Sequence, residues 1–164
     1  MRIPGRPLAQ SFATDDRGVA LVEMTLIVPF MLVLAAGVFE FSNLLHTRLL
    51  IDAGVEDAAR YIARCSDVLA TCESRALNLA VTGQVSGGTS RVTGWTTADV
   101  QIGPYGTFAA VDEEGNLQYR SSTSDVHVVH VSATYAYTGT GLWTFLGFGA
   151  ISLTAFHEER LIGW

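Results

Sequence analysis

The chain has 164 residues, 49% of them hydrophobic, and a formal net charge of −6. A chain of this length is expected to form one globular domain. The first 18 residues hold three Arg and two Asp, a net charge of +1, so the remaining residues carry −7. An acidic body argues against nucleic acid as a partner, because contacts with phosphate backbones depend on clusters of Lys and Arg.

Residues 1–16 have the composition of a flexible polar leader. Pro4, Gly5 and Pro7 lie within it and disfavour a helix. Arginines before the apolar segment that follows outnumber those just after it, where Arg48 stands alone. This asymmetry favours a cytoplasmic leader and a C-terminal body on the other side of a membrane.

An apolar run occupies residues 19–41 and predicts a transmembrane helix. Its 23 positions give a helix of about 34 Å at about 1.5 Å per residue, enough to cross a bilayer. One carboxylate, Glu23, lies near its start, where an ionisable group costs roughly 2.5–3.5 kcal/mol to insert. Such a group usually pairs with another charge or has a function.

Cleavage after Gly18 would explain Glu23. Val19 would then carry a positive α-amine one helical turn from Glu23, and the carboxylate could neutralise the amine of its own chain or of a neighbour. A carboxylate in the first turn also suits the positive end of the helix dipole. The alternative is that Glu23 lies at headgroup level without a role.

Pro29 lies inside the apolar run and predicts a kink near Thr25, because proline lacks a backbone donor and clashes with the carbonyl four residues earlier. The Thr25 hydroxyl is expected to help satisfy a freed carbonyl. The kink either allows bending as subunits pack or is a tolerated membrane proline.

The helix is expected to continue as an amphipathic segment over residues 42–64. Its apolar stripe has spacings of seven, four, three and four, and consists of Leu44, Ile51, Val55, Ala58 and Ile62. On the other side, Glu56 and Arg60 form a favourable i,i+4 pair. The stripe is expected to pack on the sheet of the same domain.

Two cysteines, Cys65 and Cys72, follow this segment and suggest a disulfide if the domain is exported. In one continuous helix they would lie about 10 Å apart along the axis, beyond the Cα separation of about 7 Å that a disulfide tolerates. A bridge therefore requires the helix to break, with Ser66, Asp67 and Thr71 as candidate breakers. Two free buried thiols are the alternative.

The rest of the chain is mainly a β pattern. A short helix is expected at 73–81, and strands at 91–93, 98–102, 107–111, 116–120, 125–137 and 150–157. Gly103-Pro104 is expected to stop a strand, a polar turn is expected at 112–115, and residues 158–160 should end the chain in water. Residues 125–137 are apolar on both faces and predict a central strand. The apolar loop at 138–149 would, if exposed, be a contact surface for a partner subunit or the membrane.

These features together resemble a known family. Residues 17–24 (RGVALVEM), Pro29, and residues 37–41 (GVFEF) are similar to the N-terminus of type IV pilins and pseudopilins, and most of all to the TadE-like minor pilins of tight-adherence (Flp, type IVb) pilus systems. Residues 57–63 and 150–155 resemble later parts of that family. Met24 departs from the pattern, because many members have Tyr or Phe at that position.

The resemblance implies a type IV pilin-like α+β fold, in which a long N-terminal helix, transmembrane and then amphipathic, packs on a small, mainly antiparallel sheet. It implies a leader over residues 1–18 that is cut between Gly18 and Val19, a transmembrane helix over 19–41, its continuation over 42–64, and an exported domain over 65–164. The implied partners are a prepilin peptidase, other Tad minor pilins, the major pilin, the inner membrane and the pilus assembly platform. Whether such a subunit primes assembly, caps the tip or supports an adhesin stays open.

Two other classes of protein remain as alternatives. One is an unprocessed, single-pass periplasmic binding or sensor module. The other is a secreted enzyme released by signal peptidase near Ala36, although Glu23 and Pro29 would interrupt the core of a signal peptide.

The sequence contains no recognisable catalytic constellation, and no cofactor is expected. His127 and His130 are three apart on a strand and point to opposite faces, so they cannot chelate one ion as a pair. The two cysteines lack the further ligands of a zinc site, and residues 112–115 lack the ligand spacing of a calcium loop.

Overall fold

The computed structural model describes residues 17–65, 70–118, 125–147 and 149–162. The chain forms two compact units, residues 1–41 and residues 42–164. The predicted leader at 1–16 and the predicted helix breakers Ser66 and Asp67 lie outside the described residues.

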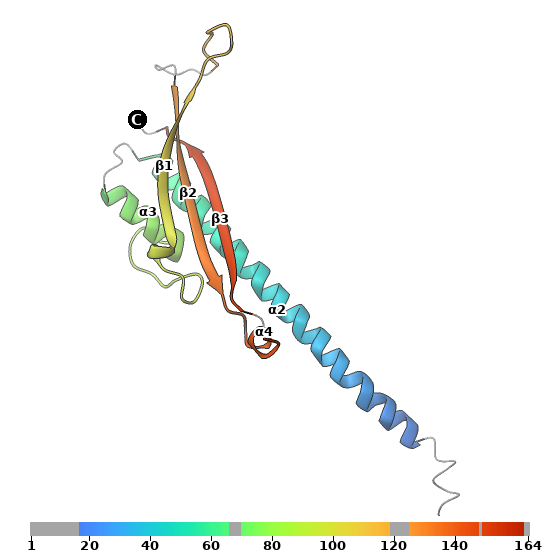
Figure 1. Ribbon diagram of the computed structural model, residues 1–164. Helices are drawn as coiled ribbons and strands as arrows, with labels where there is room; N and C mark the ends of the chain where they lie inside the picture. The colour runs from blue at the N-terminus through green and yellow to red at the C-terminus, as the bar shows by residue number, and fades with distance from the viewer. Residues whose placement is uncertain (1–16, 66–69, 119–124, 148, 163–164) are drawn as a thin grey trace, which may run out of the picture. The chain divides into compact units, whose positions relative to one another are not determined.

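Helix α2 runs from Arg17 to Ala63 and passes through both units (Figure 1). Its bounds confirm the long helix expected over residues 19–64, and it continues through Pro29. The prediction for Thr25 was wrong: its hydroxyl donates to the Leu21 carbonyl over 2.7 Å. A Thr hydroxyl in a helix reaches the carbonyls three or four residues back, whereas Pro29 frees the carbonyl of Thr25 itself.

The helix breaks between the two cysteines, as a bridge requires. A tight turn ends α2, with the Cys65 amide donating to the Ile62 carbonyl over 3.0 Å, and helix α3 runs from Ala70 to Thr82. Cys65 and Cys72 are joined by a disulfide, with their Cα atoms 6.7 Å apart. The bridge therefore connects the end of α2 to the first turn of α3.

The sheet has three antiparallel strands in the order β1-β2-β3 (Figure 1). β1 spans Val100–Ala109, β2 spans Asp125–Tyr137 and β3 spans Ile151–Arg160. The bounds of β2 and its central place confirm the prediction from its two apolar faces. A single helical turn, α4 (Leu142–Phe145), lies in the connection from β2 to β3.

The expectations for β1 were partly wrong. Residues 97–99 form a 3-10 turn, and the strand continues through Gly103-Pro104 to Ala109. Its register against β2 shifts between Ile102 and Tyr105. Because β1 is an edge strand with an irregularity at this point, a proline that cannot donate to the ladder is tolerated there.

Three further strand expectations needed correction. Residues 91–93 are not a strand: 91 and 92 are bends, and a turn over 92–95 is closed by the Trp95 amide, which donates to the Val92 carbonyl. Around the confirmed turn at 112–115, the pairing among the described residues is a bridge between Val111 and Leu117, and residues 119 and 120 of the expected strand lie outside the described part of the chain. Residues 158–160 are the end of β3, where cross-strand pairing with β2 holds them in the sheet.

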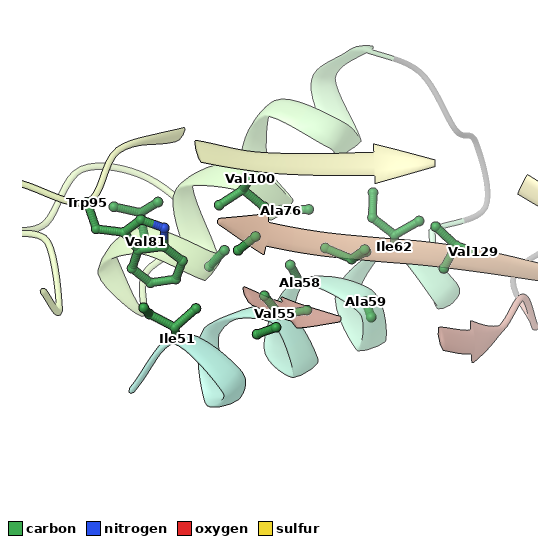
Figure 2. Packing of buried hydrophobic residues seen from close by; sticks show 14 of the residues in the cluster. Ile51, Val55, Ala58, Ala59, Ile62, Ala76, Val81, Trp95, Val100 and Val129 are labelled. Carbon is green, nitrogen blue, oxygen red and sulfur yellow. The ribbon is translucent and has the colours of Figure 1, made fainter. Parts of the chain in front are cut away.

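The core of the 42–164 unit lies between the helices and one face of the sheet (Figure 2). Four of the five predicted stripe residues of α2 are buried, namely Ile51, Val55, Ala58 and Ile62, and Leu44 packs at the edge of the core. They meet Ala76 and Ala80 of α3 and Val129 and Val131 of β2. Trp95, which stands on the loop between α3 and β1, completes this core.

Candidate functional site

The largest apolar surface among the described residues belongs to the N-terminal part of α2. Large hydrophobic side chains from Val19 to Phe41 are exposed around the helix. The span Gly18–Ala63 is long and apolar enough to cross a membrane, with a mean hydropathy of 2.4 in its most apolar window. A helix that is apolar all round is stable only in lipid or among other helices, which is consistent with a single-pass membrane anchor.

Gly18 and Val19, the predicted cleavage site, lie in the first turn of α2. Gly18 has no neighbouring atom within 4 Å of the position that a Cβ would occupy, and Val19 is exposed. The first amides of a helix lack intrahelical partners. Unwinding this turn therefore breaks few hydrogen bonds.

Glu23 is exposed on α2, four residues after Val19. Four residues correspond to about 6 Å along the helix axis, so an amine on Val19 would be one turn from the carboxylate. Glu40, the carboxylate that ends the apolar run, is 2% exposed. The two carboxylates of the run therefore differ in accessibility: Glu23 is available to another molecule and Glu40 is not.

Leu45 and Leu49 were missed by the sequence analysis. Both are exposed, and they lie four residues apart on α2, beyond the apolar run. The adjacent Leu44 and Leu50 pack against the core. The signal was present in the two Leu-Leu pairs of this segment, because each pair places one side chain toward the sheet and one away from it. This second stripe extends the apolar surface of α2 into the 42–164 unit.

The histidines of the sheet do not form a metal site among the described residues. His130 Nδ1 lies 3.2 Å from Glu158 Oε1, and His157 Nε2 lies 3.2 Å from Glu159 Oε2. His130 also stacks on Phe156, with ring centroids 5.7 Å apart. No group of three or more His, Cys, Asp or Glu side chains within the described ranges could hold a metal ion.

Part of the chain matches a known protein family. Residues 18–60 match the family of TadE-like proteins. The matched segment begins at Gly18, contains Glu23 and Pro29, and ends within the part of α2 that packs on the sheet. The resemblance to TadE-like proteins is thereby confirmed over these residues. Neither the curated proteins nor the solved structures gave a significant match.

Proposed function

We propose that this chain, whose residues 18–60 match the TadE-like family, is a minor pilin or pseudopilin of a Tad (Flp, type IVb) pilus. The observation that carries the proposal is that the family match coincides with the exposed apolar helix and includes both Gly18 at its start and Glu23 one turn later. A prepilin peptidase would cut between Gly18 and Val19. The mature helix would then be able to leave the bilayer and pack with other pilin helices.

Pairing of the Glu23 charge gives a physical reason for cleavage to precede assembly. In the precursor, Glu23 is a carboxylate near one face of the membrane. After cleavage, its charge would be neutralised by the amine of Val19 on the same chain or on the next subunit. An exposed carboxylate suits pairing between subunits, because a second chain can approach it. The major pilin, other minor pilins and the assembly platform in the inner membrane would be the partners.

The 42–164 unit would lie in the periplasm before assembly and in the pilus afterwards. The arginines of the leader support a cytoplasmic N-terminus, and a disulfide suits an oxidising compartment. In this location the unit would supply specific contacts with neighbouring subunits, while α2 supplies the common packing surface.

Mass spectrometry of the mature N-terminus tests the proposal. The chain is expressed with its cognate peptidase, and the expected product begins at Val19. Gly18→Leu, which blocks the small-residue position before the cut, is the matched uncleaved control. An uncut wild-type chain, or one that begins elsewhere, would contradict the proposal; an uncut chain whose stability responds to a ligand would favour a membrane-anchored sensor module.

A further inference from the structure

The connection between β2 and β3, described over residues 138–147 and 149, exposes apolar side chains at one end of the 42–164 unit; residues 138–147 form the tip loop. Phe145 is 85% exposed, the highest value among the large hydrophobic side chains described. Leu146 beside it is 49% exposed, and Leu142 and Trp143 are partly exposed. An isolated exposed apolar residue is ordinary, but adjacent ones on a turn indicate a contact surface.

The tip loop holds Phe145 outward through its own hydrogen bonds. The Phe145 amide donates to the Gly141 carbonyl over 2.9 Å, and the Leu146 amide donates to the Leu142 carbonyl over 2.9 Å. The Trp143 indole donates to the Gly149 carbonyl over 3.1 Å. Backbone groups that are already paired can enter a region poor in water at low cost.

The contact between Asn43 and Tyr137 shows which part of α2 lies near the start of the tip loop. The Asn43 amide donates to the Tyr137 hydroxyl over 2.9 Å. Tyr137 is the last residue of β2, and the tip loop begins immediately after it. Asn43 follows the last residue of the apolar run, Phe41, by two positions. In Figure 1, α4 lies at this same end of the sheet.

The β2 and β3 residues at this end of the sheet are uncharged, although His46 and Arg91 line a pocket together with Tyr137 and Gly139. No Asp, Glu, Lys, Arg or His occurs between His130 and His157. The charged residues of β2 and β3 lie at the opposite end, because the antiparallel register pairs Val128 with Arg160 and Tyr137 with Ile151. The charged end suits water, and the uncharged end suits the boundary between headgroups and acyl chains.

We infer that the tip loop is a membrane-interface anchor, with Phe145 and Leu146 inserted into the lipid surface on the side of the membrane that holds the 42–164 unit. The inference rests on the proposed function in one respect, namely that residues 19–41 span the bilayer. Lipid is favoured over a protein partner because the loop follows Tyr137, whose hydroxyl is bonded to Asn43, two residues after the end of the apolar run. Trp143 supports this assignment, since Trp is enriched at the membrane interface.

Spin labels on the full chain in nanodiscs of phosphatidylethanolamine and phosphatidylglycerol test the inference. The native cysteines are bridged, so a single introduced cysteine accepts the label. Thr144→Cys places it on the tip loop and keeps Phe145 and Leu146. The label is expected to be more accessible to oxygen, which concentrates in lipid, than to a water-soluble nickel complex. Adding Phe145→Ser and Leu146→Ser should reverse that order.

Labels at two further positions distinguish a failure of the tip-loop inference from a failure of the pilin proposal. Phe108→Cys is the water control: Phe108 is 57% exposed and pairs with Val126, eleven residues or about 36 Å of strand from Tyr137. Leu34→Cys reports on the anchor helix. If the label at position 34 is more accessible to oxygen and the label at position 144 is more accessible to the nickel complex, the tip-loop inference is overturned and the pilin proposal stands. If both labels are more accessible to the nickel complex, the tip-loop inference and the pilin proposal are both overturned. If the label at position 144 is protected from the nickel complex only when other pilus subunits are added, the tip-loop inference is overturned in favour of a protein partner.

Discussion

Gly54 of α2 lies directly against the backbone of Ala80 in α3. A Cβ placed on Gly54 would be 2.5 Å from the Ala80 carbonyl oxygen and 2.7 Å from the Trp95 ring. Atoms this close overlap, so the glycine is what allows the two helices to approach while both cover the sheet. Because Trp95 and Ala80 are fully buried, neither has room to move away.

Gly54→Ala should therefore destabilise the 42–164 unit, by about 1–3 kcal/mol for an overpacked core. Thermal unfolding in detergent, followed by near-UV circular dichroism of the aromatic side chains, measures the effect. Gly37→Ala is the control in the same helix, because nothing lies within 4 Å of a Cβ there. Equal melting temperatures for the two variants would contradict the close approach.

Glu23→Ala should leave the chain in the membrane and impair its assembly with partner pilins. Removing a carboxylate makes insertion easier, but the amine that the proposed cleavage would create on Val19 would then have no counter-charge in an apolar environment. Membrane fractionation and co-purification with the other subunits measure the two properties separately. Val22→Ala, a change to the neighbouring exposed apolar residue, should affect neither, and normal filaments from Glu23→Ala would rule out the pairing role.

Removing the bridge between Cys65 and Cys72 should lower the free energy of unfolding by roughly 2–3 kcal/mol, the value that the chain-entropy account gives for a loop of this size. Urea unfolding of wild-type protein with and without dithiothreitol measures it. The double change of Cys65→Ser and Cys72→Ser should unfold at the same urea concentration in both buffers. Two reactive thiols in protein isolated without reductant would argue for free cysteines.

Two ion pairs on neighbouring positions of α2 should differ in their effect on stability. Asp57 bonds to Arg91, whose side chain is 19% exposed and also donates to the Leu79 carbonyl over 3.4 Å, so the pair ties the loop after α3 to α2. The pair of Glu56 and Arg60 is more exposed. Asp57→Asn should reduce the free energy of unfolding by about 1–2 kcal/mol, and Glu56→Gln by about 0.5 kcal/mol or less. Urea unfolding compares the two variants, and similar effects would mean that Arg91 does not hold the loop.

The hydroxyl of Tyr105 in β1 should lose its proton at a higher pH than an ordinary tyrosine. Burial, together with the hydrogen bond that its hydroxyl donates to Glu73 Oε1 over 2.9 Å and the Glu73 charge, raises the pKa of Tyr105 to about 12. Because the neutral phenol is favoured in the folded state, its contribution to stability is complete below pH 10 and is lost as the pH rises through 12. Subtracting the ultraviolet titration of Tyr105→Phe from that of the wild type isolates this group. Glu73→Gln should move its pKa only part of the way back, since burial remains.

The residues that repeat with a regular period were readable from the sequence. The apolar run gave the membrane-length helix, and the stripe from Leu44 to Ile62 gave the helical face that the core covers. A disulfide between Cys65 and Cys72 would require the helix to break, and the structure contains both the disulfide and the break. The alternation in residues 125–137 gave β2 with both ends correct. The apolar run, the stripe and the alternation each lie within one element, so local geometry alone turns these patterns into structure.

Other features of the fold depended on tertiary contacts between residues that are distant in the sequence. Gly103-Pro104 can stand inside β1 only because that strand is at the edge of the sheet, and edge position comes from pairing with β2. Residues 158–160 belong to β3 because β2 is long enough to pair with them. The contact of Gly54 with Ala80, the burial of Trp95 and the exposure of Phe145 are likewise properties of packing. No local period encodes these, because each is decided by residues distant in the chain that meet only once the helices close on the sheet.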